Sequence, residues 1–159
     1  MKLNLGSYVY PLKGYVNVDI KAWMGGELIA DLNKLPWPLP SGHYEEVRAF
    51  DIIEHLGKLT KVEIIEELAR ITKVGGRVHI RVPCATHALA LQSIQHAHIF
   101  YFDSFARDYA QPYFECESRW VTILGGKYRF RFQRPFRPLF RLLGRMKMVY
   151  CLEFELRKV

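Results

Sequence analysis

Short stretches of alternating apolar and polar residues predict that the chain begins with two strands. Within residues 2–6 Leu3 and Leu5 alternate with polar residues before a glycine, and within residues 15–20 Val16 and Val18 also alternate with polar neighbours. This period of two is typical of a strand with one buried face. Because the intervening segment is short and contains Pro11, any helix between the two strands is limited to about one turn.

Two further strands are expected before the middle of the chain. Residues 28–32 indicate a short third strand, and the run EEVRAFDII indicates a fourth that ends near Phe50 or Asp51. The proline-rich stretch 35–42 between them must be a loop, because proline cannot donate to a strand ladder.

The clearest helix is predicted at residues 60–71. Thr60 and Glu63 form a capping box, in which a hydroxyl and a carboxylate satisfy free backbone N–H groups at the helix start. Gly75 and Gly76 are expected to end the helix, because glycine readily adopts the left-handed conformation. Apolar residues recur at helical spacing and define one buried face: Leu59, Val62, Ile65, Leu68 and Ile71.

Strand patterns return in the second half of the chain. Residues 77–83 alternate so strictly between aliphatic and basic residues that one face of this strand should be poorly covered by apolar groups. Residues 119–124 and 127–132 flank a glycine turn, and residues 148–159 close the chain as a last strand. If residues 127–132 pair antiparallel with this last strand, four charges could neutralise one another: those of Arg129, Arg131, Glu153 and Glu155.

This succession of strands and crossovers predicts an α/β fold with a mostly parallel sheet and an antiparallel edge. The length of 159 residues suits a single domain, 1–159, in which residues 134–145 form a basic and apolar insertion. No apolar run approaches the roughly 20 residues that cross a bilayer. The three cysteines form no CxxC pair, which argues against a disulfide framework or zinc cluster and favours a cytoplasmic location.

The net charge of +7 is concentrated near the C-terminus. From Arg119 onward there are eleven Lys or Arg residues against two acidic ones, which leaves a net charge of −2 for residues 1–118. Such asymmetry favours an anionic partner for the C-terminal segment, either nucleic acid or a phosphate-bearing substrate. The alternative is a solvated basic face that aids solubility.

Four residues close a predicted strand or begin the loop after one: Gly6, Asp19, Asp31 and Asp51. Ligands of mostly parallel sheets bind at the carboxyl ends of the strands, so these residues should lie on one rim. A carboxylate at Asp19 can accept two hydrogen bonds from the hydroxyls of a ribose. The alternative for Asp19 alone is a carboxylate that only stabilises a turn.

Four segments, taken in order, resemble the class I S-adenosylmethionine-dependent methyltransferases, and most closely their compact branch with a shortened first helix. They are LNLGSYVYPLKGYVNVDI, ADLNKLPWPLPSG, EVRAFDIIEHLGK and ELARITKVGGRVHIRVP, and the resemblance covers roughly residues 2–105. It implies a three-layer, Rossmann-like fold with a mostly parallel seven-stranded sheet and an antiparallel C-terminal strand. It also implies S-adenosyl-L-methionine as the cofactor.

The first part of the cofactor site follows from this resemblance. Gly6 and Ser7 match the loop beneath the methionine part of the cofactor, Asp19 matches the acidic residue that holds the ribose, and Ile20 packs on the adenine. Tyr8 departs from the family pattern, which is Gly-x-Gly at this place. A tyrosine fits only if the loop bends away or if its ring forms a wall of the pocket.

The second part of the cofactor site comes from the loops after the third and fourth strands. Asp31 and Leu32 match the pair at the adenine edge, where a carboxylate can receive the exocyclic amine. Asp51 and Ile52 match the residues that line the methyl-transfer site.

Methyl transfer is an in-line displacement, so the protein mainly has to position the acceptor and exclude water. A general base can assist, and the candidates are His96, His55 and Asp51. His96 matches a histidine that borders the substrate in the family, whereas His55 could equally stabilise a helix start. His98 and His87 are expected to be surface or packing residues. No metal ligand is predicted.

The sequence leaves the methyl acceptor open. It contains neither the Asn/Asp-Pro-Pro-Tyr/Phe run of amino-methylating nucleic-acid enzymes nor a Pro-Cys pair of the cytosine C5 type. Because the chain has little to cover a substrate, a second copy in a homodimer or another partner could complete the site. The alternative function is a catalytically degenerate module that binds nucleic acid or another anionic partner through its basic C-terminal segment. A nicotinamide-dependent dehydrogenase is disfavoured, since Gly6-Ser7-Tyr8 lacks the GxGxxG pattern.

Overall fold

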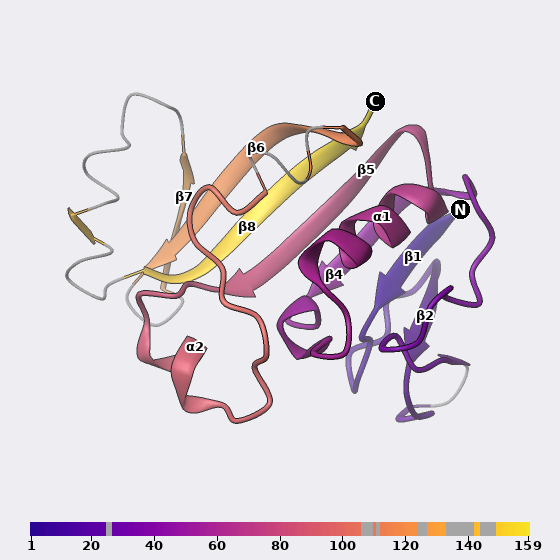
Figure 1. Ribbon diagram of the computed structural model, residues 1–159, viewed down its shortest axis with the longest axis horizontal. Coiled ribbons are helices and arrows are strands. Elements are labelled where there is room, and N and C mark those ends of the chain that lie inside the picture. Colours follow the sequence, from indigo (N-terminus) through magenta and orange to yellow (C-terminus); the bar gives the residue numbers. More distant parts are fainter. Residues whose placement is uncertain (25–26, 106–109, 111, 124–126, 133–141, 144–148) are drawn as a thin grey trace.

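A single mixed sheet organises the chain in the computed structural model (Figure 1). The structure describes all residues except 25–26, 106–109, 111, 124–126, 133–141 and 144–148. In the described part of the chain the sheet has eight strands, in the order β3-β2-β1-β4-β5-β8-β6-β7. The insertion expected at residues 134–145 therefore lies outside the described residues, apart from Leu142 and Leu143.

The first five strands run parallel, as the hydrophobic pattern predicts. They are β1 (Lys2–Leu5), β2 (Tyr15–Asp19), β3 (Leu28–Ile29), β4 (Tyr44–Phe50) and β5 (Thr72–Pro83). Strand β3 is shorter than the expected 28–32. Buried aliphatic residues of β1 and β4 form the centre of the sheet, because these strands have a neighbour on each side: Leu3, Leu5, Val47 and Ala49.

The C-terminal strands complete the sheet in antiparallel fashion. Strand β8 (Val149–Lys158) lies between β5 and β6 (Phe114–Ile123), and β7 (Tyr128–Phe132) pairs with the outer edge of β6. The expected number of seven strands is wrong, because β7 adds an eighth beyond β6. Direct pairing of residues 127–132 with the last strand is also wrong, because β6 separates them.

Helix α1 (Lys61–Ile71) begins as predicted and ends differently. The Thr60 hydroxyl accepts from the Glu63 N–H at 3.2 Å, and the Glu63 carboxylate accepts from the Thr60 N–H at 2.7 Å, which confirms the capping box. The last cap is Thr72, which is already extended, so the chain passes directly into β5. Gly75 has a φ of +76° within β5 rather than at the helix end.

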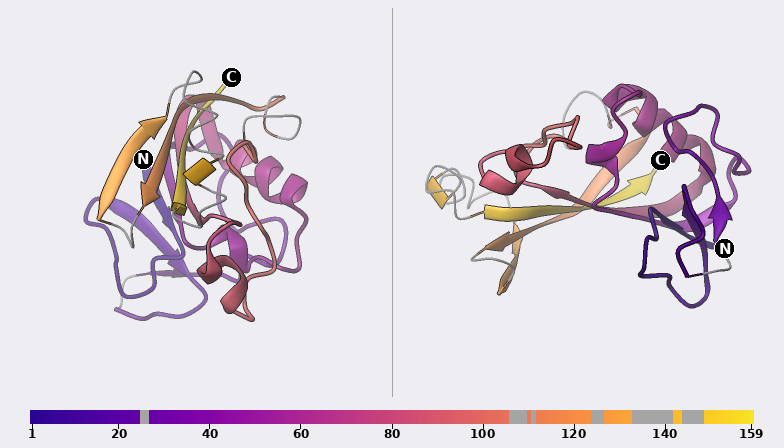
Figure 2. Two further views of the ribbon diagram at one scale, coloured as in Figure 1. Left: turned by 90° about the vertical axis from the view of Figure 1, so that its left-hand side faces the viewer. Right: turned by 90° about the horizontal axis from the view of Figure 1, so that it is seen from below.

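The helices of the described chain cover one face of the sheet only, as Figure 2 shows. Besides α1 they are the short η1 (Ile53–His55) and α2 (Ala88–Gln92). The described residues therefore form two layers, the sheet and the helices on one face, instead of the expected three. The uncovered face carries charged residues instead, as the alternation in β5 predicts. Cross-strand ion pairs stabilise this face: Lys2–Glu46 at 2.7 Å, Arg77–Glu117 at 2.9 Å and Arg157–Glu115 at 2.6 Å.

The segment after β5 crosses the helix-covered face and is anchored there by aromatic rings. The rings of Phe100 and Phe105 stack with centroids 5.3 Å apart, and Phe105 meets Phe154 of β8 edge-on at 4.8 Å. Arg119 of β6 donates to Asp103 at 3.0 Å. These contacts hold residues 100–105 against β8 and β6. None of the helices in the described residues has the length and apolar character needed to span a bilayer.

Candidate functional site

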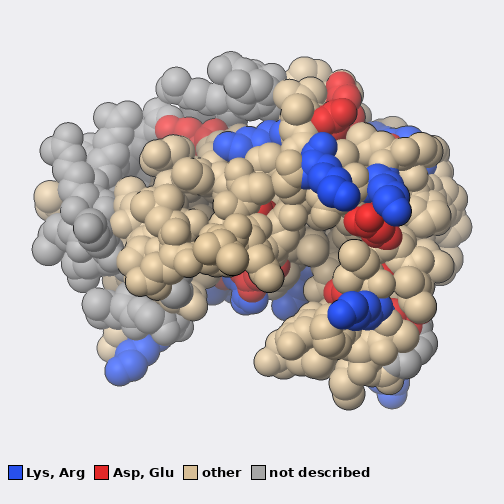
Figure 3. All heavy atoms as spheres, turned by 60° about the horizontal axis from the view of Figure 1, so that its bottom comes forward, with Lys and Arg blue, Asp and Glu red and all other residues tan. Residues whose placement is uncertain are grey.

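The four residues of the predicted rim lie at the carboxyl edge of the parallel strands. Asp19 is the last residue of β2, Gly6 and Asp51 directly follow β1 and β4, and Asp31 is the second residue after β3. Figure 3 brings this edge forward and shows a hollow between two lobes, with charged side chains at its rear. The topology thus places the loops after four neighbouring strands around one region.

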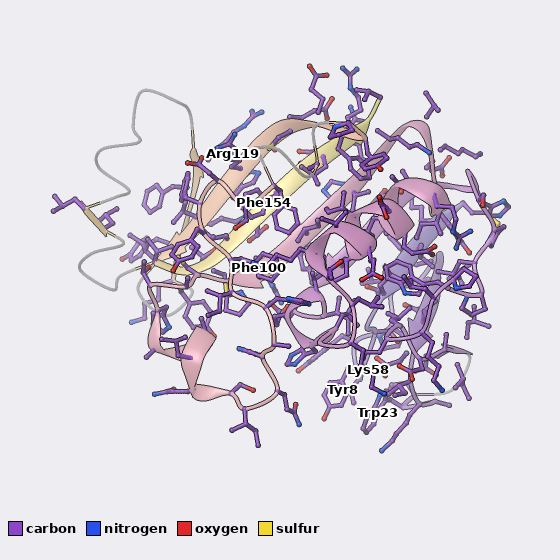
Figure 4. The ribbon with its side chains drawn as sticks, viewed as in Figure 1. Tyr8, Trp23, Lys58, Phe100, Arg119 and Phe154 are labelled. Carbon is purple, nitrogen blue, oxygen red and sulfur yellow. The ribbon has the colours of Figure 1, made fainter. Side chains whose placement is uncertain are left out.

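The loop after β1 follows the backbone path of a glycine turn even at Tyr8. Gly6 has a φ of +65°, and a Cβ at this position would lie 2.7 Å from the Cβ of Ile52. Tyr8 has a φ of +44°, which is uncommon for a residue with a side chain. Its half-exposed ring meets the Trp23 ring edge-on, with centroids 4.7 Å apart (Figure 4). The Tyr8 ring therefore points outward as a wall beside the loop.

Asp19 is 8% exposed, and the chain itself occupies both of its carboxylate oxygens. The Tyr8 N–H donates to Oδ2 at 2.9 Å. The N–H of Ile20 and the indole N–H of Trp23 both donate to Oδ1 at 2.8 Å. Sequence reasoning missed Trp23, although an indole four residues after a strand-terminal carboxylate is a readable signal.

An apolar surface lies near Asp19, on the loops after β1 and β2 and on β3. Its exposed side chains include those of Tyr8, Ile20, Trp23, Met24 and Ile29. Such surface beside a carboxylate can pack against a planar ring while the carboxylate binds hydroxyls.

The two residues after β3 serve the local fold. The Asp31 carboxylate accepts from the Asn33 N–H at 3.0 Å, which closes a turn. Leu32 is buried, and its carbonyl accepts from the Trp37 indole at 2.9 Å. The Asp31 carboxylate remains partly exposed toward the rim.

Asp51 is held by Arg81 from the neighbouring strand β5. The Arg81 Nε donates to Oδ2 of Asp51 at 2.9 Å, and a second guanidinium nitrogen also contacts that oxygen. The Asp51 N–H donates to the Arg81 carbonyl at 2.9 Å, and Asp51 has a φ of +54°. Burial works against the charged guanidinium, but the hydrogen bond and charge of Asp51 raise the pKa of Arg81. Asp51 and Arg81 therefore form an ion pair at the end of β4, in which each charge neutralises the other.

Glu54 lies under this pair and is 1% exposed. Its Oε2 has no hydrogen-bond partner among the described residues. Burial, assisted by the negative charge of Asp51, raises the pKa of the Glu54 carboxyl to about 8. The sequence resemblance included Glu54 in a motif without a role, and its burial depends on packing that the local sequence does not reveal.

The structure brings His55 and His96 together from separate segments. Their rings lie 4.8 Å apart at 63°. His55 Nδ1 lies 3.3 Å from the Gln95 carbonyl oxygen, and His96 Nδ1 lies 3.2 Å from the Ala90 carbonyl oxygen. Burial lowers the pKa of His55 below its usual range, which favours the neutral imidazole.

Backbone contacts fix the segment that carries His96 against η1. The Glu54 carbonyl accepts from the N–H groups of Ala97 at 2.8 Å and His98 at 3.2 Å. Gly57 permits this approach, since a Cβ there would lie 2.6 Å from the Cβ of Ala97. His98 donates through Nε2 to the Leu56 carbonyl at 3.0 Å, a further contact between this segment and the end of η1.

A cavity of about 790 Å³ opens beside these groups at the ends of β4, β5 and β8. Gly6 and Asp19 do not line it, so the rim divides into one half around Asp19 and a second half around the histidines. Burial raises the pKa of the Cys151 thiol in the cavity wall to about 12, which keeps it protonated at neutral pH. The side chains that line the cavity include Asp51, Glu54, His55, Arg81, His96 and Tyr150.

Comparison with known proteins finds no matching family model and no curated protein of significantly similar sequence. Solved structures match along nearly the whole chain. An S-adenosylmethionine-dependent methyltransferase from Mesorhizobium loti has 10% identity and a TM-score of 0.65, over 98% of this chain and 89% of its own. One from Thermotoga maritima has 16% identity and a TM-score of 0.66, over 99% and 81%.

A third match is geranyl diphosphate C-methyltransferase from Streptomyces coelicolor, in complex with Mg²⁺, geranyl diphosphate and S-adenosyl-L-homocysteine. It has 12% identity and a TM-score of 0.65, over 99% of this chain and 73% of its own. At these identities the similarity concerns the fold. The strand order, the antiparallel β8 and these matches agree: the chain has the fold of the class I S-adenosylmethionine-dependent methyltransferases.

Proposed function

We propose that the protein is an S-adenosylmethionine-dependent methyltransferase. The observation that carries this proposal is Asp19, a strand-terminal carboxylate next to the Gly6 loop, in a sheet with the methyltransferase strand order. The cofactor would supply an electrophilic methyl group on a sulfonium. The chain would bind this cofactor across the ends of β1 to β4 and hold an acceptor in the adjoining cavity.

The residues on the half of the rim around Asp19 fit such a cofactor. The Asp19 carboxylate can accept ribose hydroxyls once the Trp23 indole gives up its place on Oδ1. Ile20 and Trp23 offer apolar surface to an adenine. The buried Ser7 hydroxyl, which has no hydrogen-bond partner among the described residues, lies beneath the methionine end in this arrangement.

Asp51 and Ile52 would form the boundary between cofactor and acceptor. Ile52 packs on Gly6, and Asp51 lines the cavity with His55 and His96. Carbonyl oxygens can only accept, so each Nδ1 donates its hydrogen and each Nε2 is left able to take a proton. We assign the role of general base to His96, with His55 as its neighbour. Asp51, held by its ion pair with Arg81, would help to orient the acceptor in the cavity.

The alternative of a nucleic-acid-binding module receives no support from the matched structures. Arg129, one of the basic residues behind this alternative, already donates to Glu153 at 2.6 Å. Its guanidinium also covers the Trp120 ring at 4.4 Å. A second copy or another partner that completes the acceptor side remains a prediction, which light scattering coupled to size-exclusion chromatography would test.

Isothermal titration with S-adenosyl-L-homocysteine tests the proposed function directly. We expect saturable binding of one equivalent, weakened at least tenfold in Asp19→Asn, because the carboxylate is the stronger acceptor for the ribose hydroxyls. Glu45→Gln, on the exposed opposite end of the sheet, is the matched control and should bind like the wild type. Absence of binding at millimolar ligand by the folded wild type would overturn the proposal.

A further inference from the structure

Three side chains in the cavity wall gather in a way that methyl transfer does not require. Glu54, His55 and His96 each present a ligand atom, and these atoms all lie within 4.8 Å of one another. Two come from η1, and the third comes from the segment after α2. One carboxylate and two imidazoles form a donor set common in sites for Zn²⁺ and other first-row divalent metals.

The two imidazoles are already in the form that binds metal. Their Nδ1 atoms face the carbonyl oxygens of Gln95 and Ala90, so each Nδ1 carries the hydrogen. Each Nε2 therefore bears a lone pair in the neutral ring. Histidine ligands in metalloproteins are usually oriented by such a hydrogen bond from the ring nitrogen that does not bind the metal.

Glu54 supplies an independent observation. It is 1% exposed, and its Oε2 has no hydrogen-bond partner among the described residues. A buried carboxylate oxygen without a partner is costly, whether the group is charged or neutral. A cation bound by this oxygen would remove the cost.

The geometry needs only a small contraction to close on an ion. Ligand atoms about 2.0–2.2 Å from one metal cannot be more than about 4.4 Å apart, so the widest pair here would approach by a few tenths of an ångström. Arg81, the nearby cation, is neutralised by Asp51 and so does not oppose a bound ion strongly.

We propose that Glu54, His55 and His96 bind one divalent transition-metal ion, with open coordination positions that face the cavity. The nitrogen ligands favour Zn²⁺, Co²⁺ or Mn²⁺ over Mg²⁺, which prefers oxygen. The sequence alone predicted no metal ligand, and this proposal departs from that expectation because the segments that carry His55 and His96 meet in space. This site stands on its own geometry and does not depend on methyl transfer. A metal ion on His96 Nε2 would take the place of the proton, so this nitrogen serves either as the metal ligand or as the general base, and not as both at once.

Metal titration of chelator-stripped protein tests the site. Added Co²⁺ should bind with a stoichiometry of one and produce visible absorption bands, and Zn²⁺ should displace it. His96→Gln and Glu54→Gln should each weaken binding at least tenfold. His43, a partly exposed histidine on another part of the surface, is the control, and His43→Gln should leave metal binding unchanged. Binding of S-adenosyl-L-homocysteine, measured separately in each variant, distinguishes loss of the metal site from failure of the proposed function.

The wild type alone also gives a decisive measurement, should a variant fail to fold. Substoichiometric Mn²⁺ should broaden the ring-proton NMR signals of His55 and His96 and leave the signal of His43 sharp. Equal broadening of all three, no Co²⁺ bands at millimolar metal, or unchanged affinity in a folded His96→Gln variant would each overturn the proposal.

Discussion

The indole N–H of Trp23 donates a 2.8 Å hydrogen bond to Oδ1 of Asp19, on the carboxylate that we assign to the ribose. A ribose hydroxyl has to take the place of this indole or share the oxygen with it. This hydrogen bond therefore competes with binding of the cofactor. The contact between the Trp23 and Tyr8 rings also couples the two loops that border the site.

Replacing Trp23 by Phe should tighten the binding of S-adenosyl-L-homocysteine by about fivefold, because removal of one competing hydrogen bond changes the balance by about 1 kcal/mol. The phenyl ring keeps an apolar surface for the adenine. Calorimetric titration measures the change. In the wild type, Trp23 fluorescence should respond to ligand, and the response should vanish in the variant. Weaker binding by Trp23→Phe would mean that the indole supports the cofactor.

Substitutions at Tyr8 should report on the backbone rather than on the ring. Tyr8→Gly relieves a positive φ, which costs about 1–2 kcal/mol for a residue with a side chain, but it loses the contact with Trp23. We expect stability within about 1 kcal/mol of the wild type. Tyr8→Val should lose about 2 kcal/mol, because β-branched residues tolerate this region poorly. Urea unfolding compares them, and equal stability of the two variants would contradict this view of the loop.

Gly6 should tolerate no side chain. A Cβ would lie 2.7 Å from Ile52 at a φ of +65°, so Gly6→Ala should cost about 3 kcal/mol from the contact and the left-handed conformation together. Gly14 also has a positive φ but has nothing within 4 Å of its added Cβ, so Gly14→Ala should cost only about 1 kcal/mol. Urea unfolding of the two variants isolates the contact with Ile52. Equal losses would show that Ile52 moves aside freely.

Glu46 should make the fold sensitive to acid. Burial works to raise the pKa of its carboxyl, but hydrogen bonds from Lys2 and Tyr15 outweigh burial and lower it. A carboxyl with a lowered pKa in the folded state stabilises the protein above its unfolded value, about 4.5, and loses that contribution as the pH falls below it. Glu46→Gln should therefore flatten the decline of the free energy of unfolding between about pH 5 and pH 3.

Denaturation in urea at several pH values measures this slope. Glu45→Gln, at the neighbouring exposed position, is the control and should keep the slope of the wild type. A slope unchanged by Glu46→Gln would exclude the cluster with Lys2 and Tyr15 as its source.

Local patterns were sufficient to predict most of the fold. The alternation in β1, β2, β4 and β5 and the capping box at Thr60 depend on neighbours in sequence, so they could be predicted. The end of α1 could not be predicted. Thr72 is both the cap of the helix and the first residue of β5, so Gly75, with its positive φ, lies within the strand and does not end the helix. Strand β7 was predicted at residues 127–132, but its partner was not, since the choice of partner is made across the sheet rather than along the chain.

The candidate site divides in the same way. Asp19 and Asp51 followed from strand ends and from a family resemblance. His55 and His96 were named separately, and their contact could not be predicted because it joins segments far apart in the sequence. Sequence spacing contains no sign that Arg81 engages Asp51, because the bond joins residues of different strands. The burial of Glu54 likewise depends on the segment that carries His96.

One carbonyl joins the two halves of the cavity wall. The backbone carbonyl oxygen of Glu54 accepts hydrogen bonds from the amides of both Ala97 and His98. These are backbone bonds, so side-chain substitutions leave them in place. Hydrogen exchange at these two amides consequently measures how often the wall detaches from η1. Slow exchange would mean a cavity assembled before any ligand arrives. Exchange that slows only on adding metal or S-adenosyl-L-homocysteine would mean that the ligand assembles it.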